Sequence, residues 1–246
     1  MSGCLPMPVL LYATECAERA RALAARLNFR CQPLATASGT AEDPGTCLLL
    51  DTDGLFLLRR ADQVRARLEL SELGRRLQQG RRLTLARACG VRQGTTILDG
   101  MAGFGLDGLT LAALGAQVTL VERDPMLYAL LRDAVERVSG DLSEPPEMYC
   151  GDVQDYLDGD RLWDVVYLDP MFEAARKQAL PNKRAQLLAA SGLAAPSDDD
   201  LLKLLALART HARQRVVLKR RRHDRVLARP GWQITGRSVR FDVYPA

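Results

Sequence analysis

The chain has 246 residues, 47% of them hydrophobic, and a formal net charge of +4, which suits one large domain or one domain with a small appendage. Its apolar runs are only a handful of residues long, and its first residues lack the charged start and long apolar centre of a signal peptide, so we expect a cytoplasmic protein without a membrane segment. The six cysteines form no C-x-x-C pair and the two histidines stand apart from them, so neither a disulfide framework nor a metal site is expected.

Residues 1–90 are predicted to form a small α/β region. A strand is expected at 9–11 and a helix at 14–27, and Asp53-Gly54 separates two apolar runs in "CLLLDTDGLFLL", which predicts a hairpin. A basic helical segment, interrupted at Gly74 and Gly80, is expected over 61–89.

Residues 91–246 alternate between strand-like and helix-like patterns, which predicts a parallel sheet with helices on its faces. Strands are expected at 95–99, 117–122, 147–152, 163–169 and 215–219. Helices are expected at 109–116, at 125–138, and from 198 to about 212 after the capping residue Ser197. The sequence "WQITGRSVRFDVY" predicts a final antiparallel pair.

A glycine-rich loop follows the strand at 95–99. Asp99 ends that strand, and Gly103, Gly105 and Gly108 spell G-x-G-x-x-G, the dinucleotide fingerprint. Glu122 ends the next strand, at a suitable distance to hold a ribose. The pattern therefore allows a nicotinamide cofactor.

The acids of this loop favour a different cofactor. A carboxylate at Asp107, inside the turn that would hold a pyrophosphate, repels phosphate, and Asp99 adds a second negative group. S-adenosylmethionine (SAM) presents a cationic sulfonium and an amino group there, and carboxylates attract both. A glycine-rich turn without a ligand is the structural alternative.

Further strand-end residues fit the remaining parts of SAM. Glu122 can accept hydrogen bonds from both ribose hydroxyls, and Arg123 flanks the adenine. Asp152 can accept from the adenine amino group while Val153 packs on the ring. Each of these acids could instead form an ordinary cap or turn.

The stretch "LDPMF" places Asp169, Pro170 and Phe172 at the same edge of the sheet. It is close to the Asp/Asn-Pro-Pro-aromatic tetrad of amino-group methyltransferases, with Met171 in place of the second proline. Asp169 and the carbonyl of Pro170 can accept the hydrogens of an exocyclic amine, and Phe172 can stack on an extruded base. The alternative is a strand that ends in an Asp-Pro turn, with Phe172 in the core.

Two basic clusters favour a polyanionic partner, although a charged helix face is usually only solvated. The residues predicted to hold RNA phosphates are Arg75, Arg76, Arg81, Arg82, Lys219, Arg220, Arg221 and Arg222.

On the glycine loop, "VVYLDPMF", "RVVLKR" and the ending "RFDVY", the chain resembles the RsmJ family of SAM-dependent methyltransferases, which modify a guanine N2 of 16S rRNA in the small ribosomal subunit of bacteria. The resemblance implies a class I methyltransferase, an α/β Rossmann-like fold with a seven-stranded sheet whose last strand is antiparallel, over residues 91–246, with a small amino-terminal extension over 1–90. It also implies the following cofactor contacts: Leu106, Asp107, Glu122, Arg123, Asp152, Val153 and Asp169. Leu106 replaces the family's arginine, and Asp152 and Val153 replace its paired serines.

The predicted activity is methyl transfer from SAM to guanine N2 of 16S rRNA, as free RNA or as the small subunit. Three alternatives remain open from the sequence: a methyltransferase acting on DNA adenine or a protein amide, a nicotinamide oxidoreductase, and a non-catalytic RNA-binding or assembly factor.

Overall fold

The computed structural model describes residues 7–37, 45–170, 183–190 and 195–246 and divides into two compact units. The first unit takes the described parts of Met1–Arg67, Pro125–Asp133 and Glu173–Leu193, and the second takes those of Leu68–Asp124, Ala134–Phe172 and Ala194–Ala246. Residues 68–90 thus group with the second unit, whereas the boundary predicted from the sequence lies at residue 90. That boundary stays a proposal.

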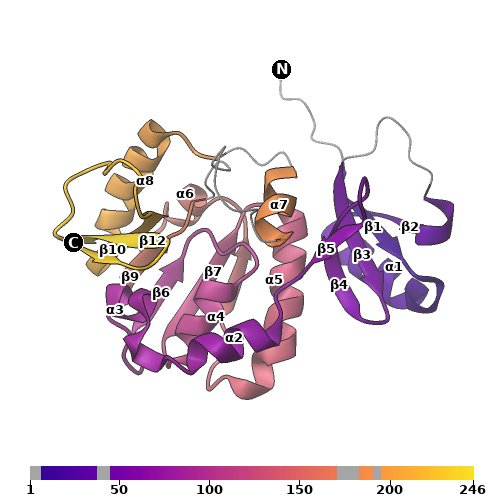
Figure 1. Cartoon of the computed structure of the whole chain (residues 1–246), viewed down its shortest axis with the longest axis horizontal. Coiled ribbons are helices and arrows are strands. Elements are labelled where there is room, and N and C mark those ends of the chain that lie inside the picture. Colours follow the sequence, from indigo (N-terminus) through magenta and orange to yellow (C-terminus); the bar gives the residue numbers. More distant parts are fainter. Residues whose placement is uncertain (1–6, 38–44, 171–182, 191–194) are drawn as a thin grey trace. The chain divides into compact units, whose positions relative to one another are not determined.

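The first unit is built on a five-stranded sheet of order β2-β1-β3-β4-β5 (Figure 1). Its elements are β1 (Val9–Tyr12), η1 (Thr14–Cys16), α1 (Ala17–Leu27), β2 (Arg30–Pro33), η2 (Leu34–Thr36), β3 (Thr46–Asp51), β4 (Gly54–Arg59), β5 (Val64–Ala66) and α7 (Lys183–Ala190). β1 is parallel to β2 and β3, and the pairs β3–β4 and β4–β5 are antiparallel. The predicted hairpin is confirmed, with Asp51 paired to Gly54 across a two-residue loop.

The prediction of a basic helical segment over 61–89 is wrong in part. Val64–Ala66 forms β5, because it pairs with β4 and this pairing overrides the local helical pattern. Gly74 does not interrupt a helix but lies inside α2 (Leu70–Leu77). An added Cβ at this position would meet no atom within 4 Å, so this side of the helix is open. Gly80 does mark a break, with a φ of +54° at the start of η3 (Gly80–Arg82).

The second unit contains a seven-stranded sheet of order β11-β12-β10-β9-β6-β7-β8 (Figure 1). Its strands are β6 (Thr96–Asp99), β7 (Gln117–Glu122), β8 (Glu147–Cys150), β9 (Trp163–Leu168), β10 (Ala212–Arg221), β11 (Trp232–Thr235) and β12 (Val239–Pro245). β12 runs antiparallel to both of its neighbours, and the other paired strands are parallel. The predicted seven-stranded α/β sheet with an antiparallel last strand is therefore confirmed.

Besides α2 and η3, the helices of this unit are α3 (Thr84–Cys89), α4 (Leu106–Ala113), η4 (Ser139–Asp141), α6 (Val153–Tyr156) and α8 (Asp198–Thr210), and both units share α5 (Pro125–Val138). Ser197 caps α8 as predicted, since its hydroxyl accepts the N–H of Asp200. Among the described helices, none is long and apolar enough to cross a membrane.

Side chains of the central strands alternate between the two faces of this sheet. Leu98, Val166 and Leu218 point to one face, where they share a core with residues of α6 and α8. Tyr167 and Lys219 therefore point to the other face, where both bond to a residue of α4. This second face carries the polar cluster described below.

Candidate active site

The loop between β6 and α4 lies at the carboxyl edge of the sheet, and two of its glycines have a positive φ. Gly103 has a φ of +56° and Gly105, the residue before α4, a φ of +85°. An added Cβ would meet no atom within 4 Å at Gly103, whereas at Gly100 it would lie 2.6 Å from Cγ2 of Val153. The loop therefore packs on one side and leaves open space at Gly103, as a closely approaching ligand requires.

Glu122 lies at the end of β7, as predicted, and is 7% exposed. Its Oε2 accepts the N–H of Gly103 (2.7 Å) and its Oε1 that of Asp124 (2.8 Å). Burial raises the pKa of this carboxyl, against the lowering effect of the two backbone donors. Each carboxylate oxygen keeps a second acceptor position, so the group still suits two ribose hydroxyls.

The residues predicted around an adenine lie at the ends of β7 and β8. Asp152 is the N-cap of α6 and its Oδ1 accepts the N–H of Gln154 at 2.9 Å. Nη1 of Arg123 lies 3.9 Å from Oδ2 of Asp152, and Val153 is buried. Asp152 thus has the capping role that the sequence left as an alternative, and a ligand contact from its other oxygen stays a prediction.

Asp107, in the first turn of α4, is the centre of a buried polar cluster. It accepts hydrogen bonds from the Tyr167 hydroxyl (2.6 Å), the Lys219 ammonium (2.7 Å) and the guanidinium of Arg76 in α2. Burial opposes its charge, but Lys219 and Arg76 outweigh burial and hold the pKa of Asp107 well below its usual range. Burial and the nearby carboxylates raise the pKa of Tyr167, which stays a neutral donor.

Lys219 joins this cluster to Asp169. Its Nζ lies 2.7 Å from Oδ2 of Asp169 as well as from Oδ2 of Asp107. Burial lowers the pKa of the Lys219 ammonium, but the two carboxylates outweigh it and raise that pKa. Burial and the nearby Asp107 raise the pKa of Asp169, against the lowering effects of Lys219 and Arg76. Pro170 is buried beside it, and the predicted residues Met171 and Phe172 lie outside the described residues.

The charges of this cluster correct the electrostatic argument made from the sequence. Two cations, Arg76 and Lys219, accompany the two carboxylates of Asp107 and Asp169, so the loop does not present Asp107 as an uncompensated negative group. Burial also raises the pKa of Asp99 well above its usual range, which favours its neutral form. The physical reason for preferring SAM over a dinucleotide was therefore wrong, and the choice of cofactor depends on the comparisons below.

Asp99 and Gly108 show how closely α4 approaches the sheet. Asp99 is 1% exposed, and its Oδ2 has no hydrogen-bond partner among the described residues. An added Cβ at Gly108 would lie 2.8 Å from this oxygen and 2.3 Å from Cδ2 of Leu120. A side chain at 108 therefore requires a shift of α4 or of the buried side chains of Leu120 and Asp99.

We expect Gly108→Ala to lower the free energy of unfolding by about 1–3 kcal/mol, the usual cost of overpacking a core. Denaturant unfolding of the two proteins measures this difference. Gly74→Ala is the matched control, because it adds the same methyl group to a helix at an open position. Equal stability of Gly108→Ala and the wild type would contradict the packing described here.

The eight residues predicted to bind RNA do not share one environment. Arg75, Arg81, Arg82 and Arg222 are exposed, and Arg221 is half-buried. Arg76 and Lys219 bond to the acids of the cluster, and the 7% exposed Arg220 lies 3.5 Å from Asp198 and 3.8 Å from Asp224. These internal ion pairs already engage the side chains of Arg76, Lys219 and Arg220, so they do not favour the assignment of these three to RNA phosphates, which stays an untested prediction. The prediction is also kept for the exposed arginines.

Sequence reasoning missed three members of the cluster. In the sequence, Tyr167 stands only as part of an apolar strand, and Arg76 and Lys219 stand only as parts of basic runs. The available signal is spacing: Tyr167 precedes Asp169 by two residues and so shares its side of the strand. Among the described residues, no group of acids, cysteines or histidines could hold a metal ion.

The strand order and the acids at the carboxyl ends of β6, β7 and β9 define the class I methyltransferase fold. The model of the family described as "Putative SAM-dependent methyltransferase" matches residues 40–246. A solved SAM-dependent methyltransferase from Neisseria gonorrhoeae is 27% identical, with a TM-score of 0.71, and the match covers 96% of this chain and 95% of that one.

Curated relatives identify the family more narrowly. Ribosomal RNA small subunit methyltransferase J of Alkalilimnicola ehrlichii is 39% identical over 92% of this chain and 90% of its own length. The protein of the same name from Thioalkalivibrio sulfidiphilus is 37% identical over 95% of each chain. The chain belongs to this methyltransferase J family, and its cofactor is SAM.

The residues present fit this cofactor. The open space at Gly103 and the remaining acceptor positions of Glu122 are what a nucleoside needs at the edge of such a sheet. The SAM dependence of the family also decides against the nicotinamide oxidoreductase that the G-x-G-x-x-G pattern allowed.

Proposed function

We propose that this chain methylates the exocyclic N2 of a guanine in 16S rRNA, as free RNA or within the small ribosomal subunit, in the cytoplasm. The observation that carries the proposal is the match to curated small-subunit rRNA methyltransferases over nearly the full length of both chains. The position of Asp169 after β9, at the edge that carries the glycine loop, supports it.

The proposed roles of the site residues follow from their positions. When bound, SAM supplies an electrophilic methyl group, whose bond to sulfur breaks as the bond to the guanine nitrogen forms. Asp169 accepts a hydrogen of the amine and orients its lone pair, and the proton released goes to this carboxylate or to solvent. Lys219 binds Oδ2 of Asp169, while the described residues form no hydrogen bond to Oδ1, which can face the substrate.

A transfer assay tests the substrate class. The purified protein is incubated with labelled SAM and with rRNA, DNA or protein from cells that lack this chain. We expect label in the small-subunit rRNA alone. Label in DNA or protein would support the alternative amino-group substrates, and binding of ribosomal particles without any transfer would support an assembly factor.

The pKa of Asp169 predicts an acidic limit to activity. Burial raises this pKa above the usual Asp value of about 4. At pH values just above about 4 the carboxyl is therefore still protonated and cannot accept a proton. The turnover number should therefore fall, as pH is lowered, at a pH above that value. Removing the ammonium in Lys219→Met should move this limit to higher pH, and Lys219→Arg should not. A profile that is identical in all three proteins would contradict the proposed pairing of Lys219 with Asp169.

A further inference from the structure

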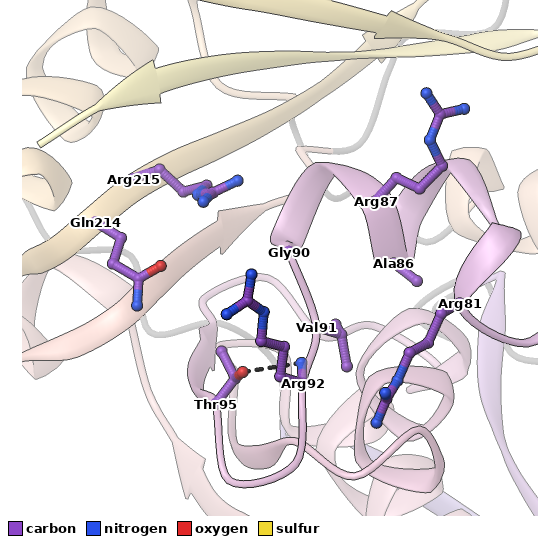
Figure 2. Close-up of a pocket in the computed structure, with 9 residues that line it drawn as sticks. All are labelled: Arg81, Ala86, Arg87, Gly90, Val91, Arg92, Thr95, Gln214 and Arg215. Atoms are coloured by element: carbon purple, nitrogen blue, oxygen red, sulfur yellow. Dashed lines mark hydrogen bonds between the residues drawn. The ribbon is translucent and has the colours of Figure 1, made fainter.

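A basic pocket of about 420 Å³ lies away from the candidate active site. It is formed by η3, α3, the loop that follows α3, and the first part of β10, and four arginines line it: Arg81, Arg87, Arg92 and Arg215 (Figure 2). No acidic residue lines it, and none of the four arginines forms an ion pair with another residue in the described part of the chain. The pocket therefore concentrates positive charge.

Two of these arginines are directed into the same space. Figure 2 shows Arg215 extending from β10 toward Gly90 and Arg92 extending from the loop toward the same region, with Gln214 on the β10 side of the pocket. Gly90, with a φ of +63°, makes room for Arg215, because an added Cβ would lie 3.2–3.3 Å from its guanidinium atoms. Nε of Arg215 is buried and has no hydrogen-bond partner among the described residues. The donors that an anion can reach are therefore those of the terminal nitrogens, Nη1 and Nη2, which lie beside Gly90.

An aromatic side chain lies next to the pocket. Trp232 of β11 is 42% exposed, and Cζ of Arg215 lies 5.4 Å from the centre of its ring. Arginines beside an exposed aromatic ring are the combination that binds single-stranded nucleic acid, since the cations hold phosphates and the ring stacks on a base.

The pocket lies at the opposite edge of the sheet from Asp169. Arg215 and Lys219 are four residues apart on β10, a separation of about 13 Å at about 3.3 Å per residue. A ligand in this pocket would thus be distinct from the cofactor and the target base, yet within reach of one RNA strand.

We infer that this pocket binds backbone phosphates of the substrate RNA, with Trp232 stacking on an unpaired base beside it. The inference rests on the proposed function, because it takes RNA as the substrate class. Phosphate contacts remote from the reacting base would fix the register of the RNA on the protein.

The test measures binding of a labelled single-stranded oligoribonucleotide of about 12 nucleotides, a length in the usual range for such sites. Arg92→Ala/Arg215→Ala should weaken binding at least about ten-fold at moderate salt. The slope of log affinity against log salt is negative, and its magnitude should decrease by about 1.4, or about 0.7 for each phosphate that is no longer neutralised. Arg92→Ala alone, at an exposed position, should decrease the slope by about 0.7 and tests the inference even if the double variant folds poorly.

The matched control is Arg26→Ala/Arg209→Ala, which removes the same charge from two exposed positions outside the pocket. Equal loss of affinity in the two pairs, or an unchanged salt slope in the pocket variants, would overturn the inference. Trp232→Ala should weaken binding about ten-fold and Trp232→Phe should largely restore it.

Different results would contradict the proposed function and the pocket assignment. If the wild type binds RNA through the pocket but methylates no rRNA, the proposed function fails and the pocket assignment stands. If the wild type methylates rRNA and the pocket variants keep its KM for RNA, the pocket assignment fails and the proposed function stands.

Discussion

Replacing Asp169 by alanine should lower the turnover number by a factor of about 10²–10⁴, the usual contribution of a positioned proton acceptor. The expected loss follows from the place of Asp169, whose carboxylate ends β9 at the cofactor edge and is held by Lys219 at 2.7 Å. Affinity for SAM should change less than about ten-fold, because the residues assigned to the nucleoside lie on other strands. Methyl transfer at saturating substrates, with calorimetric titration of SAM, measures the two effects separately.

Asp169→Asn is the matched control for this prediction. It keeps the shape and one acceptor oxygen of the side chain, so it should retain more activity than the alanine variant. Full activity of Asp169→Ala would refute its assigned role. A loss of SAM affinity as large as the loss of turnover would instead assign Asp169 to cofactor binding.

Replacing Lys219 by methionine should lower the free energy of unfolding by about 3–5 kcal/mol, as expected when one partner of a buried ion pair is removed. The ammonium is shared by Asp107 and Asp169, and its side chain is 17% exposed. Without it, Asp169 has no cation within bonding distance among the described residues, and Asp107 keeps only Arg76. Denaturant unfolding at neutral pH measures the change.

The pKa values predict how this loss depends on pH. The lowered pKa of Asp107 stabilises the fold above the unfolded value near 4, and this contribution is lost as pH falls through the folded value. The raised pKa of Lys219 stabilises the fold below about pH 10.4, and that contribution is lost as pH rises through the folded value. The stability difference between wild type and Lys219→Met should therefore be largest at neutral pH and shrink in acid.

A double variant tests whether the effect comes from the ion pair. In Lys219→Met/Asp169→Asn the carboxylate is removed together with its cation, so part of the lost stability should return. Lys219→Arg keeps the charge and should be the least affected of the three. Strictly additive losses in the double variant would contradict the coupling between Lys219 and Asp169.

The sheet of the second unit could be predicted because each of its central strands is a short apolar run with a recognisable boundary. Pro125 at the start of α5 and Ser197 before α8 marked two helices whose starts agree with the structure. The strand at 64–66 could not be predicted in the same way, because its pairing with β4 is a tertiary interaction that its own three residues do not encode.

The site was only partly predictable, for a related reason. The positions of Glu122 and Asp169 could be predicted because strand ends of a parallel sheet meet at one edge. Lys219 was grouped with the arginines that follow it, since the sequence does not give the register that pairs Leu218 with Leu168 and so places Lys219 beside Asp169. The ion pairs of Asp107 could not be predicted for the same reason, because the cations that compensate its charge, Arg76 and Lys219, come from α2 and β10.

Mass spectrometry of 16S rRNA from cells that lack this protein tests the central proposal most directly. The account predicts that one N2-methylguanosine is missing, that the wild-type chain restores it, and that Asp169→Ala does not. An unchanged set of methylated guanosines in the deletion strain, or full restoration by Asp169→Ala, would contradict it.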